Sequence, residues 1–278
     1  MKKNIRNSLS TNYQRFFKRG ISGVTASSRV LPNFIIIGTV RSGTTSLYYN
    51  ICEHPSVLPA AYDEIGFFDS NFHLGLNWYR SMFPTKKEME KIKEKTNFAI
   101  TGEDTPFYFW KKETVSRIIN AVPNSKLIVI VRNPVDRAYS NYNLGIRKKV
   151  EESTFEKAID EEICFIENHS FRECIDRKRS YLSKGFYAKQ FSIWQEKFSQ
   201  KKLHVVSTEE MEKQPQITMS KIFEFLEIPK YNIKNPQKQK SANYKKMHVD
   251  TRKKLLEFYK PHNEEFFNKI NQSFDWDD

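Results

Sequence analysis

The segment at residues 34–46 restricts the possible folds of this chain more than any other. It reads Phe-Ile-Ile-Ile-Gly-Thr-Val-Arg-Ser-Gly-Thr-Thr-Ser. The apolar run up to Gly38 is continuous rather than alternating, which predicts a strand buried on both faces. A loop of small residues follows, and a helix is predicted over residues 44–53. This strand–loop–helix arrangement is typical of phosphate-binding loops, in which backbone N–H groups and a helix N-terminus hold an anion.

The position of the cation distinguishes this loop from the P-loop of an ATPase. The spacing from Gly38 to Gly43 fits a P-loop, but Thr44 stands where an ATPase needs Lys. The cation comes earlier, as Arg41. We infer a phosphate ligand that does not require the usual ATP γ-phosphate and Mg²⁺ chemistry.

A second strand followed by a helix is predicted at residues 126–140, Lys-Leu-Ile-Val-Ile-Val-Arg-Asn-Pro-Val-Asp-Arg-Ala-Tyr-Ser. The strand covers residues 127–131, and Pro134 suits the first turn of a helix. Arg132 ends the strand, and Ser140 lies about two turns into the helix. An arginine fork together with a hydroxyl matches the charge and geometry of a terminal phosphate dianion.

The remaining pattern predicts an α/β protein. Strands are predicted at 33–38, 97–101, 127–131 and 203–206. Helices are predicted at 44–53, 75–83, 86–95, 111–121, 134–149, 154–168, 181–197, 217–226 and 250–270. This alternation predicts a P-loop-like three-layer fold with a central parallel sheet flanked by helices, and a ligand at the carboxyl ends of the strands. We expect one domain over residues 33–278, preceded by a basic, flexible segment at residues 1–32.

These motifs carry a resemblance to a known family. Arg41-Ser-Gly-Thr-Thr45 resembles the 5′-phosphosulfate loop, Lys-x-Gly-Thr-Thr, of sulfotransferases that use 3′-phosphoadenylyl sulfate (PAPS). Residues 126–140 resemble the 3′-phosphate motif of the same superfamily. The similarity runs from about Asn33 to Trp276 and is greatest to carbohydrate sulfotransferases. These are the heparan N-deacetylase/N-sulfotransferases, the glucosaminyl 3-O-sulfotransferases and their bacterial relatives.

The resemblance implies two separate sites for the donor PAPS and its product PAP. Arg132 and Ser140 would hold the 3′-phosphate. The 5′-phosphosulfate site would be formed by Arg41, Ser42, Gly43, Thr44, Thr45 and Ser46. In that site Arg41 would stabilise the leaving phosphate electrostatically, because an arginine does not readily give up a proton.

Two further segments resemble parts of the family that cover the donor. Residues 238–247 correspond to a loop that reads Lys-x-Lys-Gly-Arg-x-Tyr-Pro-x-Met in the family. By that match Lys240 and Tyr244 would bind the cofactor, and Ser241 replaces the glycine. Residues 183–187 resemble Ser-x-x-x-Tyr, which places Tyr187 in the nucleotide or acceptor cleft.

The acceptor side is expected at two acidic segments. Residues 62–69 resemble a stretch whose glutamate acts as the base, which assigns that role to Glu64. Burial beside phenylalanines would raise its pKa. Asp69 matches an acidic residue that contacts the sugar or the catalytic network in 3-O-sulfotransferases. Glu103 and Asp104 are expected acceptor contacts, and Asp104 stands where the family has Lys.

The composition of the chain says less about its binding partners than the motifs do. The net charge of +13 would attract PAPS, an acidic glycan, a membrane surface or nucleic acid, and it also suits a merely well-solvated surface. No nucleic-acid-binding module is recognisable, and the resemblance to carbohydrate sulfotransferases implies a carbohydrate acceptor as the partner. The six histidines show no metal-binding spacing, so no metal is expected. No apolar run approaches the roughly 20 residues that span a bilayer. We expect no transmembrane segment and a cytoplasmic location, with peripheral membrane association left open.

The leading hypothesis is therefore transfer of the sulfuryl group from PAPS to a hydroxyl or amine of a carbohydrate, by direct in-line displacement. Two alternatives stay open at this point. A kinase-like phosphotransferase would need Lys in place of Thr44 and Asp in place of Arg132. A basic polyanion-binding protein without catalysis would need clustered basic residues with exposed aromatic side chains. Acceptor identity and oligomeric state also stay open.

Overall fold

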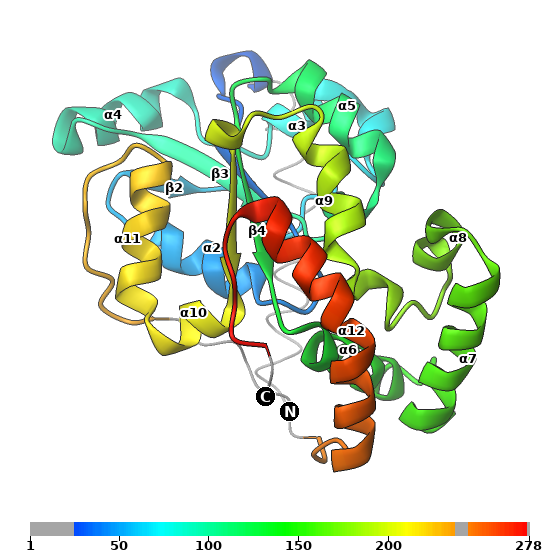
Figure 1. Ribbon diagram of the computed structural model, residues 1–278. Coiled ribbons are helices and arrows are strands. Elements are labelled where there is room, and N and C mark those ends of the chain that lie inside the picture. Colours follow the sequence, from blue (N-terminus) through cyan, green and yellow to red (C-terminus); the bar gives the residue numbers. More distant parts are fainter. Residues whose placement is uncertain (1–24, 237–243, 277–278) are drawn as a thin grey trace, which may run out of the picture.

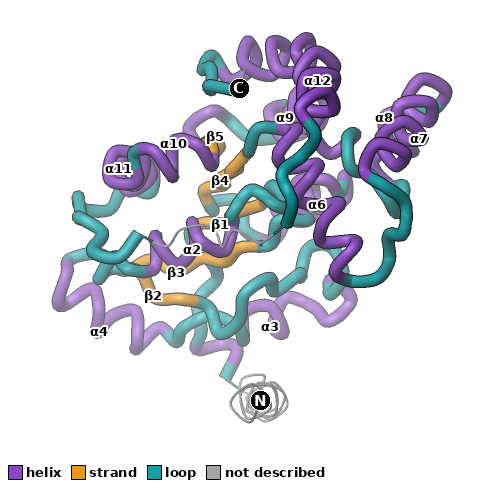
Figure 2. The backbone as a smooth tube through the Cα atoms, turned by 90° about the horizontal axis from the view of Figure 1, so that it is seen from below, coloured by secondary structure: helices purple, strands orange, loops and turns teal. Residues whose placement is uncertain are grey.

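The computed structural model describes residues 25–236 and 244–276. Its centre is a five-stranded sheet in the order β2-β3-β1-β4-β5, with every neighbouring pair parallel (Figures 1 and 2). The strands are β1 (Phe34–Gly38), β2 (Val57–Pro59), β3 (Ile100–Asp104), β4 (Lys126–Val131) and β5 (Leu203–Ser207). This confirms the α/β class and the central parallel sheet.

Alternate residues of β1 enter two different cores, which is why helices cover both faces of the sheet. Phe34 and Ile36 pack with α2 (Thr44–Cys52), α10 (Thr208–Lys213) and α11 (Pro215–Phe225). Ile35 and Ile37 pack with α5 (Lys112–Ala121), α9 (Tyr187–Gln195) and α12 (Val249–Ile270). Because all four side chains are fully buried, the continuous apolar run predicts the three layers correctly.

A third apolar cluster lies beside the sheet. It joins α6 (Pro134–Arg147) to α7 (Phe155–Asn168) and α12 through Val135, Phe155, Leu182 and Tyr259. The short helix α8 (Phe171–Asp176) packs beside α7, and Figure 1 shows this pair projecting from one side of the molecule. The remaining helices are α3 (Gly75–Arg80) and α4 (Lys86–Thr96).

Several boundaries differ from the sequence prediction. The helix expected at 181–197 begins only at Tyr187, after a 3₁₀ turn at Ser183–Gly185. A side chain at Gly185 would put its Cβ 2.6 Å from the Tyr259 ring, so α12 lies closer than any larger residue would allow. The structure also contains β2, α8 and α10, which the pattern did not predict, because each has only three to six residues.

Residues 25–32 fall within the segment expected to be flexible, yet they contact the domain. The Arg29 guanidinium donates to the Phe83 carbonyl at 2.6 Å, and the Val30 N–H donates to the Pro84 carbonyl at 3.1 Å. Residues 1–24 lie outside the described part. Within that part, no helix combines the length and the apolar character needed to cross a membrane.

Candidate active site

The loop after β1 is held in place by polar contacts to its neighbours. The Thr39 N–H donates to the Ile130 carbonyl of β4 at 2.6 Å, and the Thr39 and Ser42 hydroxyls are hydrogen-bonded at 2.6 Å. The Thr208 hydroxyl, at the start of α10, donates to the Ser42 carbonyl at 2.8 Å. Gly43 caps α2 with a φ of 87°, a conformation that favours glycine. The loop that leads into the first turn of α2 is therefore held by β4 and α10, and the N-terminus of a helix is a typical place for an anion.

Arg41 links the two predicted phosphate motifs. Its Nε and Nη2 atoms donate to the Ser140 hydroxyl at 3.1 and 2.9 Å. Arg132 Nη1 donates to the Arg41 carbonyl at 3.4 Å. The sequence interpretation had placed Arg41 and Ser140 at opposite ends of the donor, whereas here they touch. The two motifs form one continuous cationic edge.

The electrostatics of this edge favour an anion. Burial, and next the positive charge of Arg147, lower the pKa of Arg41 from its ordinary value. Arg132 and Arg137 contribute in the same direction. Since like charges disfavour one another, a bound dianion would relieve their mutual repulsion.

The backbone of Arg132 is held from the core. The Tyr187 hydroxyl donates to the Arg132 carbonyl at 2.8 Å, and the Tyr187 side chain is only 1% exposed. The Asn133 side chain caps α6 by accepting from the Val135 N–H at 2.9 Å. Tyr187, expected in the cleft, thus supports the strand end rather than lining the cavity.

A cavity of about 720 Å³ opens in front of the loop. Its lining includes Arg41 and the start of α2, together with Glu64, Tyr49 and Phe107. The complete lining also includes Val40, Gly43, Thr44, Thr45, Ser46, Pro106, Asn141, Leu144, Gly145, Lys148, Val150, Lys178, Arg179, Tyr181 and Lys184. The cavity therefore joins the phosphate loop to the predicted base.

Glu64 has an exposed side chain on a backbone of positive φ, 49°. Its N–H donates to the Asp104 carbonyl at 3.0 Å, which ties the loop to the end of β3. Although the carboxylate is open to solvent, the surrounding protein raises the pKa of Glu64, and Asp63 adds to that rise while Lys148 opposes it. The direction agrees with the sequence expectation and suits a general base.

The other acidic candidates lie elsewhere. Glu103 is buried and accepts from Tyr79 at 2.6 Å, Thr105 at 2.7 Å and Tyr108 at 3.2 Å. Burial raises the pKa of Glu103 to about 7. Asp69 lies in the loop whose carbonyl groups accept from Arg117. Neither carboxylate lines the cavity formed by the described residues.

Asp104 is the most unusual of these acids. Its side chain is 0% exposed, and neither carboxylate oxygen has a hydrogen-bond partner among the described residues. Burial, and next the charges of Asp63 and Glu103, raise the pKa of Asp104 to about 8. It lies behind the cavity wall rather than on it. The structure thus places the family's lysine position in the core, beneath Glu64.

Four basic residues of the cavity were missed by the sequence analysis. These are Lys148, Lys178, Arg179 and Lys184, which we call the basic wall. Burial, and next Arg137, lower the pKa of Lys184 to about 8. The signal available in the sequence was the pair of basic runs at 147–149 and 177–179. Their distance along the chain concealed that they share a cavity.

The predicted covering loop is only partly visible. Lys240 and Ser241 lie outside the described residues. Tyr244 packs edge-to-face on Tyr139 with ring centroids 5.4 Å apart, and Tyr244 interacts electrostatically with Arg41. Among the described residues, no group of three or more His, Cys, Asp or Glu side chains could hold a metal ion.

The parallel sheet, the loop at its carboxyl edge and the adjoining arginine–serine pair form an arrangement that is typical of phosphate-binding α/β proteins. The chain belongs to the sulfotransferase family, since a profile described as "Sulfotransferase domain" matches residues 31–278.

Curated relatives carry the same assignment. Mouse heparan sulfate glucosamine 3-O-sulfotransferase 3B1 is 30% identical over 276 residues, covering 91% of this chain and 66% of that protein. Mouse bifunctional heparan sulfate N-deacetylase/N-sulfotransferase 4 is 28% identical over 271 residues, covering 87% of this chain and 30% of that protein. Membrane-associated sulfotransferase kil1 of Dictyostelium discoideum is 26% identical over 319 residues, covering 88% of this chain and 66% of that protein. This chain thus spans just under two thirds of the first of these relatives.

Among solved structures, a sulfotransferase from Alicyclobacillus acidocaldarius superimposes with a TM-score of 0.66 at 24% identity. The match covers 88% of this chain and 98% of that chain. It establishes the fold independently of the sequence motifs.

Proposed function

We propose that this protein transfers the sulfuryl group of PAPS to a hydroxyl or amine of an acidic glycan. The contact of Arg41 with Ser140, and of Arg132 with the Arg41 backbone, is the observation that carries this proposal. These contacts bring the two predicted phosphate motifs together, as binding of one donor by both motifs requires. The cavity lined by Arg41, the start of α2 and Glu64 then accommodates the acceptor.

The donor is held by charge and by backbone geometry. The loop N–H groups and the Thr44 and Thr45 hydroxyls bind the 5′-phosphosulfate at the start of α2. Arg132 and Ser140 bind the 3′-phosphate. On this assignment Ser140 exchanges its bond from Arg41 for the donor phosphate, which frees Arg41 for the leaving group.

The reaction is a single displacement. Glu64 takes the proton of the acceptor hydroxyl or amine as that atom forms its bond to sulfur. The bond between sulfur and the bridging oxygen of the donor breaks, and PAP leaves with the electron pair. Arg41 stabilises the negative charge that develops on the departing phosphate. Sulfate is neither oxidised nor reduced in this step.

The basic wall supports an anionic acceptor. Four cationic side chains line the same cavity as the predicted base, where carboxylates or sulfates of a glycan would meet them. The names of the mouse relatives specify heparan sulfate, which carries such groups. A kinase-like function and simple polyanion binding find no support in the family match.

The donor class is tested by thermal shift with PAP and with ATP–Mg²⁺. We expect PAP to raise Tm by several degrees and ATP–Mg²⁺ to have little effect, because the loop lacks the P-loop lysine. Arg132→Ala should abolish the PAP shift, whereas Lys112→Ala, an exposed change on α5, should preserve it. Equal stabilisation by ATP–Mg²⁺ would refute the donor assignment.

A further inference from the structure

Three of the four residues of the basic wall, Lys178, Arg179 and Lys184, come from one segment, residues 177–185, which we call the cationic loop. Tyr181 from the same loop also lines the cavity. A loop of like charges would spread apart in water, so some structure must hold these side chains on the cavity. Hydrogen bonds to the N–H groups and to the carbonyl groups of the loop hold it in place.

The N–H side of the loop is bound by one carboxylate. Glu162, from α7, is 0% exposed. Its Oε2 atom accepts from the N–H groups of Tyr181 and Leu182 at 2.7 and 2.8 Å. Its Oε1 atom accepts from the N–H and hydroxyl of Ser183 at 2.9 and 2.7 Å. Each carboxylate oxygen thus accepts two hydrogen bonds, and the donors belong to three consecutive residues.

The carbonyl side is bound from two other helices. Arg137 of α6, also 0% exposed, donates to the Tyr181 carbonyl. The Tyr259 hydroxyl of α12 donates to the Leu182 carbonyl at 2.7 Å. Because α6 also carries Ser140, the loop is tied to the helix that borders the donor site.

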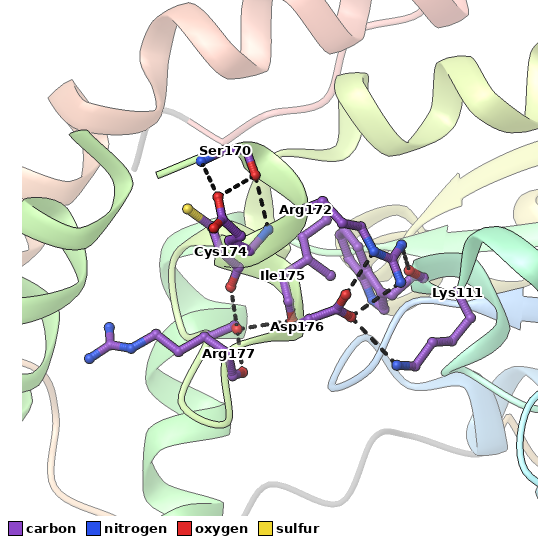
Figure 3. Close-up of polar contacts among 10 residues, drawn as sticks. Lys111, Ser170, Arg172, Cys174, Ile175, Asp176 and Arg177 are labelled. Carbon is purple, nitrogen blue, oxygen red and sulfur yellow. Dashed lines mark hydrogen bonds and ion pairs between the residues drawn. The ribbon is translucent and has the colours of Figure 1, made fainter. Parts of the chain in front are cut away.

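Two side chains of the loop, and the residue before it, are anchored as well. The Tyr181 hydroxyl donates to Glu151 at 2.8 Å, and Glu151 pairs with Arg179 at 3.2 Å. Figure 3 shows the upstream end: Asp176 is paired with Arg172 at 2.7 Å and with Lys111 at 3.5 Å. The loop is therefore held at residues 179 and 181–183 by groups that do not line the cavity.

Burying a carboxylate is unfavourable unless the free energy of its hydrogen bonds exceeds the free energy of hydration that it loses. Glu162 meets this condition only while the loop keeps its present shape. From this we propose that Glu162 is a positioning residue for acceptor binding: its carboxylate fixes residues 181–184 so that Tyr181 and Lys184 stay on the cavity. This inference rests on the proposed function, in which the cavity holds an anionic glycan.

Glu162→Gln tests the inference. An amide has one acceptor oxygen and offers N–H groups where two loop donors need an acceptor, so the loop should loosen. We expect the KM for a heparan sulfate oligosaccharide to rise about tenfold while the KM for PAPS stays within about twofold. Glu161→Gln, an exposed change one residue earlier, should leave both constants unchanged.

Equal rises in both KM values would indicate a merely structural role and overturn the inference, as would an unchanged acceptor KM. Should Glu162→Gln fail to fold, Ser183→Ala removes a single donor to the same carboxylate and decides the matter. It should raise the acceptor KM alone by about threefold. No selective rise would reject the inference.

Amide hydrogen exchange separates this inference from the proposed function, because it needs no acceptor. The N–H groups of residues 181–183 should exchange slowly in the wild type and at least about tenfold faster in Glu162→Gln. Unchanged exchange would overturn the positioning role whatever the acceptor is. Accelerated exchange in a protein that binds PAP but no acidic glycan would instead overturn the acceptor assignment.

Discussion

Arg41 shows how one side chain can serve two motifs. Its guanidinium reaches the Ser140 hydroxyl on α6, while its own carbonyl accepts from Arg132. The planar fork allows this double contact to one oxygen, and the compact ammonium of a lysine would not reproduce it. An arginine in the family's lysine position is therefore accommodated by the neighbouring helix.

At the scale of single residues, the pH dependence of stability tests whether burial raises the pKa of Asp104. Its folded pKa of about 8 lies above the ordinary value of about 3.9, so the folded protein keeps a proton that the unfolded chain loses. Stability should therefore fall as pH rises from about 4 to about 8. Asp104→Asn removes the part of this pH dependence that comes from residue 104, while the raised pKa of Glu103 leaves its own part. The variant should be more stable than the wild type by roughly 1–3 kcal/mol at pH 8, and similar to it at pH 4.

Denaturant unfolding at the two pH values measures this difference. Glu90→Gln, an exposed change on α4, should show no such pH-dependent gain. A variant at position 104 that is no more stable than the wild type at pH 8 would contradict the raised pKa of Asp104.

At the scale of elements, the cationic loop makes acceptor binding dependent on pH. The pKa of Lys184 is lowered to about 8, so this residue loses its charge as pH rises through that value. The KM for an acidic glycan should accordingly increase several-fold between pH 7 and pH 9, with the KM for PAPS much less affected. Lys184→Arg should flatten this profile, because arginine stays charged throughout the range.

Steady-state kinetics at a series of pH values check this. Lys112→Arg provides the matched control on an exposed helix. If the wild type and Lys184→Arg show the same acceptor profile, Lys184 is not the group that meets the acceptor charge.

The elements also show what sequence patterns can predict. The β1–loop–α2 unit and the β4–α6 unit were predicted nearly to their ends, because a buried apolar run and a proline at the first helical turn are local signals. The helix expected from residue 181 was wrong at its start. Residues 181–183 instead give their N–H groups to Glu162, a contact between α7 and the loop that no local pattern contains.

At the scale of the whole molecule, the proposed donor residues could be predicted from local sequence patterns, whereas the basic wall depends on contacts between distant elements. The donor residues follow directly from two strands that are adjacent in the sheet, so their proximity could be inferred from topology. The basic wall combines the end of α6 with a loop some thirty residues later, and the packing of α7 decides where that loop lies. Glu103 shows that a motif can also mislead. Its place in the motif at residues 102–109 predicts a position in the cleft, but its hydrogen bonds to Tyr79 and Thr105 lie in the core.

Glu64 is where the two sides meet, so sulfate transfer by Glu64→Gln tests the account most directly. Labelled sulfate from PAPS should appear on a heparan sulfate oligosaccharide with the wild type and with Asp63→Asn. With Glu64→Gln it should fall at least about 100-fold, while PAP still raises Tm as in the wild type. Turnover by Glu64→Gln at the wild-type rate would contradict the account.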